Sequence, residues 1–258
     1  MSIEALPFVN WTFWATLSAG TLLVVGLTEL QGGTTRGYRL FMAFVVAAFA
    51  GVLLLSELNL PPERLASTAE LRRALVWGFV ATAVAYLLAS LARLPRAGLA
   101  VAGGLIGIMA LATLAAAGET FSAGLFTAQL ILAALALGAV NAAMLLGHWY
   151  LVTPKLSPAP LRRMMWLLVG SLVLQGILFG LALVLVGTDA VAGSMGWLTW
   201  LRLAAGILLP IGITVLAVLA SRAASLQAST GLLYIGLALV MAGSIAGASI
   251  TYPTGVPV

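Results

Sequence analysis

Long apolar runs, separated by short polar segments, divide this chain into eight parts. Each run is long enough to cross the hydrocarbon core of a bilayer, which takes about 20 residues of α-helix. A segment in lipid must satisfy its own backbone hydrogen bonds, so the runs are expected to be helices. The expected helices span residues 10–30, 40–57, 68–94, 97–117, 124–152, 161–186, 197–222 and 229–251. The pattern therefore predicts an all-α fold, a polytopic integral membrane bundle of about eight transmembrane helices.

The polar segments carry signals for helix ends and bends. Asn10 has the chemistry of an N-cap for the first helix. Pro61 and Pro62 stop any helix, and Ser67 followed by Glu70 reads as a capping box that begins the third. Pro210 lies inside the seventh segment and predicts a kink there.

Small residues four positions apart recur along several of the expected helices. Such residues let two helix backbones approach closely in lipid, so they predict a compact bundle. The pairs are Gly103 and Gly107, Ala134 and Gly138, Gly176 and Gly180, and Gly243 and Gly247. The layouts after the first and fifth helices are also alike, which suggests a single domain made of two parallel four-helix halves, residues 1–118 and 119–258.

Composition and charge narrow the class of protein further. The chain is 62% hydrophobic and only 7% charged, so it lacks the polar surface of a soluble domain. It contains no cysteine, which excludes a Cys-ligated metal site. Eight basic residues fall in loops on one side of the expected topology and four on the other. This bias predicts a multi-pass protein of the cell (inner) membrane with both termini outside, and it explains the net charge of +5 without nucleic-acid binding.

The candidate chemistry lies around the fifth helix. Thr127, Asn141 and His148 share one helical face, and Trp149 and Tyr150 follow the single histidine directly. Glu29 holds the corresponding end of the first helix, so a carboxylate and an imidazole could meet there and bind a quinone oxygen or relay a proton. The competing interpretation is an interfacial belt, in which amphipathic rings lie at headgroup level.

Other polar residues have simpler structural interpretations. Ser18, Thr21 and Thr28 form a stripe on the first helix that bonds either to Asn141 or to its own backbone. Gln129 and Gln175 are the deep amides of the fifth and sixth helices. Two charged residues also have structural interpretations. Arg202 either snorkels to the surface or pairs with Asp189 or Glu119, and Glu57 has a structural role.

The sequence lacks the motifs of several classes of enzyme and cofactor-binding protein. One histidine cannot supply a bis-histidine heme site, although His/Met ligation stays formally open, and the sequence contains no metal-ligand cluster, nucleotide fingerprint or hydrolase motif. The layout is similar to that of the membrane anchor subunits of quinone-linked oxidoreductases of the polysulfide reductase type, a similarity of plan that matches no motif residue. We therefore expect a membrane subunit of a respiratory or other electron-transfer complex, in contact with lipids and partner subunits, with quinone or lipid as candidate ligand and no catalytic residues of its own. Two alternatives stay open: a small-solute transporter or channel lined by the Thr127–His148 face, and a structural membrane protein without ligand.

Overall fold

The computed structural model describes residues 3–60, 67–117, 122–153, 156–187, 193 and 196–258. These residues form helices and the short connections between them. The helices of the first half are α1 (Leu6–Gln31), α2 (Arg36–Leu58), α3 (Ala69–Leu91) and α4 (Ala97–Ala117), with the 3₁₀ turn η1 (Ile3–Ala5) before them. The second half contains α5 (Ala123–Val152), α6 (Ala159–Val186), α7 (Gly196–Leu203), the π-helical segment η5 (Ala204–Leu208), α8 (Leu209–Arg222) and α9 (Leu226–Thr254).

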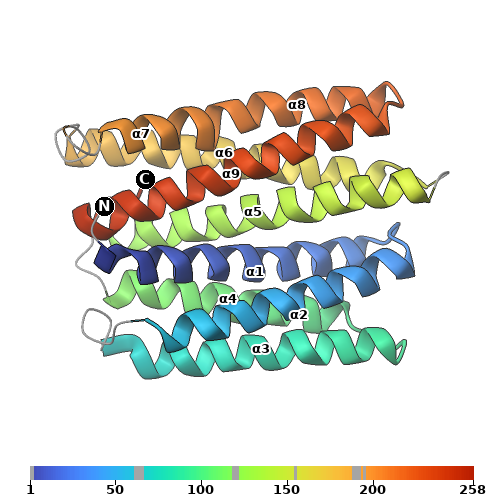
Figure 1. Cartoon of the computed structure of the whole chain (residues 1–258), viewed down its shortest axis with the longest axis horizontal. Helices are drawn as coiled ribbons and strands as arrows, with labels where there is room; N and C mark the ends of the chain where they lie inside the picture. Colours follow the sequence, from blue (N-terminus) through green and yellow to red (C-terminus); the bar gives the residue numbers. More distant parts are fainter. Residues whose placement is uncertain (1–2, 61–66, 118–121, 154–155, 188–192, 194–195) are drawn as a thin grey trace.

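Helices α1 and α5 lie side by side in the middle of the bundle (Figure 1). Helices α2, α3 and α4 cover one flank, and α6, α7, α8 and α9 cover the other (Figure 1). The two central helices are correspondingly the most enclosed, with 78% and 72% of their apolar windows buried inside the bundle. Both ends of the chain lie at the same end of the bundle (Figure 1).

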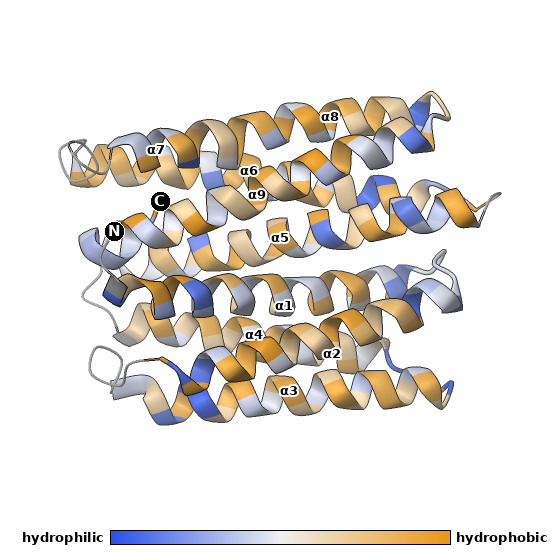
Figure 2. Ribbon diagram, in the orientation of Figure 1, coloured by the Kyte–Doolittle hydropathy of each residue, from blue (hydrophilic) through white to orange (hydrophobic). Residues whose placement is uncertain are grey.

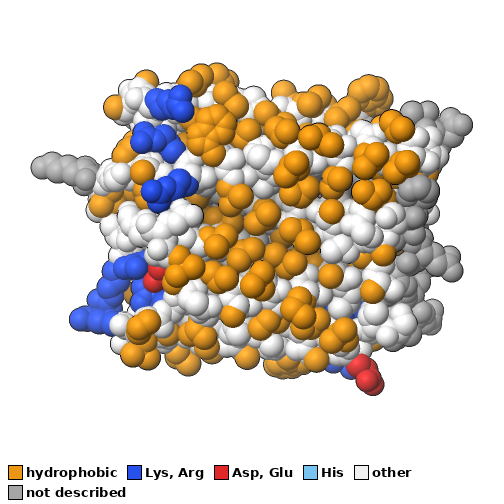
Figure 3. Space-filling model, turned by 180° about the vertical axis from the view of Figure 1, so that it is seen from behind, with side chains coloured by type: hydrophobic (Ala, Val, Ile, Leu, Met, Phe, Trp, Pro, Cys, Tyr) orange, Lys and Arg blue, Asp and Glu red, His pale blue; other side chains and the backbone are white. Residues whose placement is uncertain are grey.

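The outer surface matches a lipid environment. Within the described residues, eight helical spans are long and apolar enough to cross a membrane, with α7, η5 and α8 together forming one of them. Apolar side chains cover the middle of the molecule, and most hydrophilic residues lie near its two ends (Figures 2 and 3). Large apolar side chains such as Trp77, Leu88, Val184 and Leu216 are exposed along this surface. An all-α, multi-pass membrane bundle is therefore confirmed.

Direct backbone contact joins the two central helices. A Cβ placed on Gly20 would lie 1.8 Å from the carbonyl oxygen of Ala134, and one on Gly138 would lie 2.1 Å from the carbonyl carbon of Gly20. No larger side chain fits at either glycine without moving a helix. Gly103 and Gly107 are packed against α1 and α3 in the same way, whereas Gly180 faces open space, so the small-residue rule holds for some pairs and fails for another.

Two expected helix starts differ from the structure. Helix α1 begins at Leu6, so Asn10 lies inside the helix and its amide donates to the Ser56 hydroxyl, 2.8 Å away. Helix α3 begins at Ala69 after Thr68, which makes no side-chain cap. The expected N-cap at Asn10 was therefore wrong, and Pro61 and Pro62 lie outside the described residues.

The structure has a wider helical turn directly before Pro210, where the sequence predicted a kink. Residues Ala204–Leu208 are π-helical, and α8 begins directly after them with Pro210 in its first turn. Gly206 in this segment packs on the backbone of Gly243 in α9, where an added Cβ would lie 2.6 Å from the Gly243 Cα atom. A π-turn inserts one extra residue into a helix, and such turns often occur at functional sites and at helix kinks.

The helix order is compatible with two parallel halves. In the first half, α1 and α3 each pack on both α2 and α4. In the second half, α5 and α8 each pack on both α6 and α9. The division into residues 1–118 and 119–258 stays a prediction, since similar packing arises in any compact bundle of this size.

Candidate functional site

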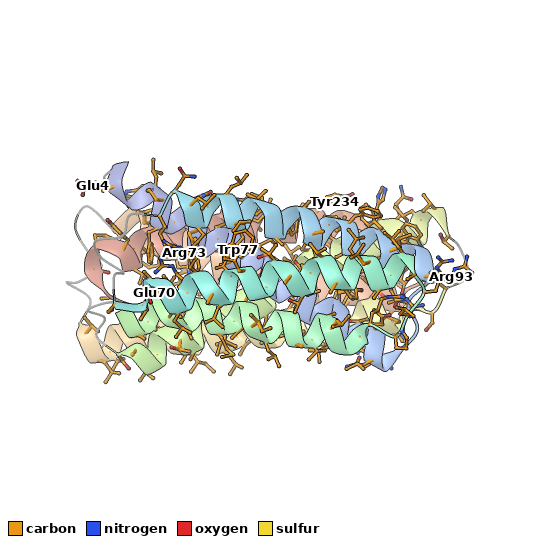
Figure 4. All side chains as sticks on the ribbon, turned by 90° about the horizontal axis from the view of Figure 1, so that it is seen from below. Glu4, Glu70, Arg73, Trp77, Arg93 and Tyr234 are labelled. Atoms are coloured by element: carbon orange, nitrogen blue, oxygen red, sulfur yellow. The ribbon has the colours of Figure 1, made fainter. Side chains whose placement is uncertain are left out.

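The single histidine meets a tyrosine on the surface of the bundle. The Nδ1 atom of His148 on α5 lies 3.3 Å from the hydroxyl oxygen of Tyr234 on α9, and both side chains are exposed. Which of the two donates depends on the imidazole tautomer. The pair offers a ring nitrogen and a phenol to the surroundings at one position, and Figure 4 shows Tyr234 on the half of the bundle nearer Arg93.

A close helix contact holds this pair in register. Gly147, next to His148, packs against Thr230 of α9, and a Cβ there would lie 2.6 Å from the Thr230 hydroxyl oxygen. Tyr234 follows Thr230 by one helical turn, so it rises beside His148. At a rise of 1.5 Å per residue, His148 lies about 6 Å from the end of α5 at Val152.

Trp149 and Tyr150 point away from the histidine. Trp149 packs on α2, where its ring is stacked with that of Phe41 at 6.4 Å between centroids and lies against Gly37. Tyr150 is buried, and its hydroxyl donates to the carbonyl oxygen of Ser157 at 2.8 Å. The three consecutive side chains therefore have different partners, and of the three only His148 contacts α9 at the surface.

Glu29 belongs to an ionic cluster of the first half. Its Oε1 atom lies 3.1 Å from Nε of Arg96 and 3.3 Å from Nη1 of Arg39, while its Oε2 accepts a hydrogen bond from the Tyr86 hydroxyl at 3.1 Å. The structure gives Glu29 and His148 separate partners and no hydrogen bond to each other. The expected carboxylate–imidazole relay is thus not formed here.

The remaining members of the predicted face also separate. Asn141 is buried and donates to the Thr21 hydroxyl at 3.2 Å, the cross-helix bond that the sequence suggested. Ser18 and Thr28 bond to their own backbone instead, to the carbonyl oxygens of Trp14 and Val24. Thr127 is half-buried and donates to the carbonyl oxygen of Ala123.

A second group of polar residues surrounds a cavity near the opposite end of the bundle. The cavity measures about 30 Å³ and lies between α1, α5, α7 and α9. Three of its lining residues are Thr12, Gln129 and Arg202, each more than nine-tenths buried. Within the part of the chain that the structure describes, the Thr12 hydroxyl, both amide atoms of Gln129 and the Nε atom of Arg202 have no hydrogen-bond partner. Buried polar groups without partners are rare, so this cavity needs an explanation.

Gln129 and Arg202 were visible in the sequence, but not as neighbours. Arg202 is buried, and its Nη2 donates to the Gln175 side-chain oxygen at 2.5 Å, so the surface snorkel was wrong. Gln175 in turn donates to the carbonyl oxygen of Leu132. Asp189 and Glu119, the expected partners of Arg202, lie outside the described residues. The wide spacing of these residues along the chain gave no sign that they converge.

Among the described residues, no group of three His, Asp or Glu side chains is placed to hold a metal ion. No protein-family model, curated protein or solved structure matches this chain.

Proposed function

We propose that this chain is a non-catalytic, multi-pass membrane component of a larger electron-transfer assembly, and that it binds a quinone head group at His148 and Tyr234. The observation that supports this most directly is the exposed pair of hydrogen-bonding rings, 3.3 Å apart, on a surface that otherwise faces lipid. An ionisable residue within a membrane-spanning helix is a candidate for a functional role.

The chemistry of the pair suits a quinone carbonyl. A quinone reaches its site through the acyl chains, so a site open to lipid at headgroup depth is accessible to it. Because Tyr234 and His148 bond to each other through Nδ1, one hydrogen-bond donor of the pair is left free, the imidazole Nε2–H or the Tyr234 O–H according to the tautomer. A quinone carbonyl oxygen can accept a hydrogen bond from that donor. The belt interpretation explains an interfacial aromatic ring, but it gives no reason for a cross-helix contact between the two rings.

The orientation belongs to the same proposal. Seven of the ten described basic residues lie at the end of the bundle that carries His148, as Figure 3 shows for one face, whereas Arg72, Arg73 and Arg202 lie toward the other end. The seven are Arg36, Arg39, Arg93, Arg96, Arg162, Arg163 and Arg222. By the positive-inside bias this end faces the cytosol of a bacterial-type inner membrane, and both termini lie outside.

Quinone titration of purified variants tests the proposal. Protein in lipid nanodiscs is titrated with decyl-ubiquinone, and a photoreactive quinone analogue maps the contact by mass spectrometry. We expect His148→Ala and Tyr234→Phe each to weaken binding about three- to tenfold, the value of one or two neutral hydrogen bonds. Trp77→Phe, a substitution of a lipid-exposed aromatic residue on α3, is the matched control and should bind normally.

Two outcomes would count against it. Unchanged affinity in both His148→Ala and Tyr234→Phe would remove the quinone claim. Purification in mild detergent, followed by native mass spectrometry, tests the assembly claim separately. If the measured masses correspond only to the monomer or to homo-oligomers of this chain, it is not a subunit of a larger complex.

A further inference from the structure

The basic end of the bundle, the end that carries His148, holds more positive charge than its one acid can neutralise. That acid, Glu29, already faces Arg39 and Arg96 and accepts a hydrogen bond from the Tyr86 hydroxyl. Five further arginines at this end are exposed or half-buried, and none of them forms an ion pair within the part of the chain that the structure describes. They are Arg36, Arg93, Arg162, Arg163 and Arg222.

The residues that the structure leaves undescribed do not supply the missing negative charge. Between α5 and α6, at the basic end, they are Pro154 and Lys155, and neither is an acid. The undescribed acids Glu63, Glu119 and Asp189 belong to the connections α2–α3, α4–α5 and α6–α7, which join helix ends at the opposite end of the bundle (Figure 1). The five arginines therefore need a negative charge from outside this chain.

Two of these arginines belong to segments that meet where α1, α2 and α6 adjoin. A Cβ on Gly33, between α1 and α2, would lie 2.9 Å from Cγ of Pro160 at the start of α6. Arg36 and Arg163 each follow this contact by three residues, at the first residue of α2 and in the second turn of α6. The Nη1 atom of Arg163 also lies 3.4 Å from the side-chain oxygen of Gln31, at the end of α1. Segments far apart in the sequence thus bring two guanidinium groups to one part of the surface.

An exposed tryptophan places this part of the surface at headgroup level. Trp166 follows Arg163 by three residues on the same side of α6, one turn closer to the middle of the membrane, and it is 48% exposed. Tryptophan rings near the ends of membrane helices lie at the boundary between headgroups and acyl chains. Arg163 therefore lies among the headgroups, and Trp166 offers an apolar ring to the acyl chain below.

The chemistry of the side chains favours a phosphate group. Of the 12 basic residues in the sequence only Lys155 is a lysine. Lysine and arginine serve equally well as topology signals, so the positive-inside bias does not explain this preference. Arginine differs because its planar guanidinium donates two parallel hydrogen bonds to the oxygens of one phosphate. Basic groups between membrane helices at the cytosolic surface are a recurrent binding site for acidic lipid headgroups.

We propose that Arg36 and Arg163 bind the phosphate group of an anionic phospholipid in the leaflet at the basic end. The hydrogen bond from Arg163 to Gln31 holds one guanidinium over the end of α1, and Arg162, the residue before it, adds a further positive charge. This site does not depend on the quinone proposal, which concerns His148 and Tyr234, and quinone titration does not test it.

Native mass spectrometry tests the site. The purified full chain in mild detergent is titrated with phosphatidylglycerol or with phosphatidylcholine, which is zwitterionic, and the masses of the lipid adducts give an apparent Kd for each. We expect phosphatidylglycerol to bind more tightly. The double variant Arg36→Gln with Arg163→Gln should raise its Kd about 10- to 30-fold, because each arginine near an anionic lipid contributes about a fivefold factor.

The matched control removes the same charge from the same end of the bundle. Arg93 and Arg222 are exposed arginines of the α3–α4 connection and of the last turn of α8, so Arg93→Gln with Arg222→Gln should keep the wild-type Kd. An equal loss in both double variants would mean a diffuse electrostatic attraction and would overturn the site. Equal affinity for the two lipids would also overturn it. Inorganic phosphate that displaces phosphatidylglycerol would assign the arginines to a free anion instead, and binding of a polyglutamate peptide without any lipid preference would assign them to an acidic protein.

Discussion

Glu57 and Arg72 form an ion pair that is buried between α2 and α3, with 3.1 Å between Glu57 Oε2 and Arg72 Nε and almost no exposure of either side chain. The indole nitrogen of Trp11 on α1 donates to the same carboxylate at 2.7 Å. Three helices of the first half are therefore joined through one charged group. This agrees with a structural role for Glu57 and places the Arg72 side chain in the interior.

Removing one charge of this pair should destabilise the protein strongly. Arg72→Met leaves the Glu57 carboxylate buried with its cation gone, which costs about 3–5 kcal/mol in comparable buried pairs. Thermal unfolding of the purified protein should show a large fall in Tm, and the double variant Glu57→Gln with Arg72→Met should recover part of it. The neighbouring Arg73 is exposed, so Arg73→Gln should unfold like the wild type (Figure 4). Equal Tm for Arg72→Met and Arg73→Gln would contradict the pairing.

A similar experiment addresses the ionic cluster at the basic end. Glu29→Gln removes the anion that faces Arg96 and Arg39, and the buried Arg96 is then left without a counter-charge. We expect a loss of about 2–4 kcal/mol, with a smaller loss of about 1 kcal/mol for Tyr86→Phe, which deletes one hydrogen bond. Glu70→Gln, an exposed acid on α3, serves as the control and should leave Tm unchanged. If high salt restored Glu29→Gln fully, the cluster would be a surface effect instead.

The sequence predicted the fold well and the sites only in part, for a physical reason. Hydropathy and loop charge depend on single segments, so eight helices followed from composition and length. The Asn141–Thr21 bond was also within reach, since both residues lie at small-residue faces of α1 and α5. The sequence does not show which residues of different helices meet in the folded protein. No local pattern indicates that Gln129 and Arg202 line the same cavity, because their proximity depends on how each helix is rotated and on which helices are neighbours. The same limit applies to His148, whose partner Tyr234 had no sequence signal.

The contact between the central helices yields a prediction about glycine. Gly138→Ala places a methyl group 2.1 Å from the Gly20 carbonyl carbon, so α1 and α5 must separate. We expect a loss of about 1–3 kcal/mol from overpacking, measured as a lower Tm. At Gly170 on α6 an added Cβ meets nothing within 4 Å, and Gly170→Ala should be neutral or stabilise the helix by about 0.5–1 kcal/mol. A destabilised Gly170→Ala beside a tolerated Gly138→Ala would show that α1 and α5 are further apart than described.

The threading of the chain can be checked on one helix alone. Glu70 and Arg93 lie near the two ends of α3 and are both exposed (Figure 4). The natural chain has no cysteine, so Glu70→Cys and Arg93→Cys each introduce a single thiol. A membrane-impermeant maleimide added to intact cells should label Glu70→Cys and should reach Arg93→Cys only after the membrane is opened, because the basic end faces the cytosol. Labelling of both from outside would mean that α3 does not span the bilayer. The reverse pattern would put His148 and Tyr234 on the outer side.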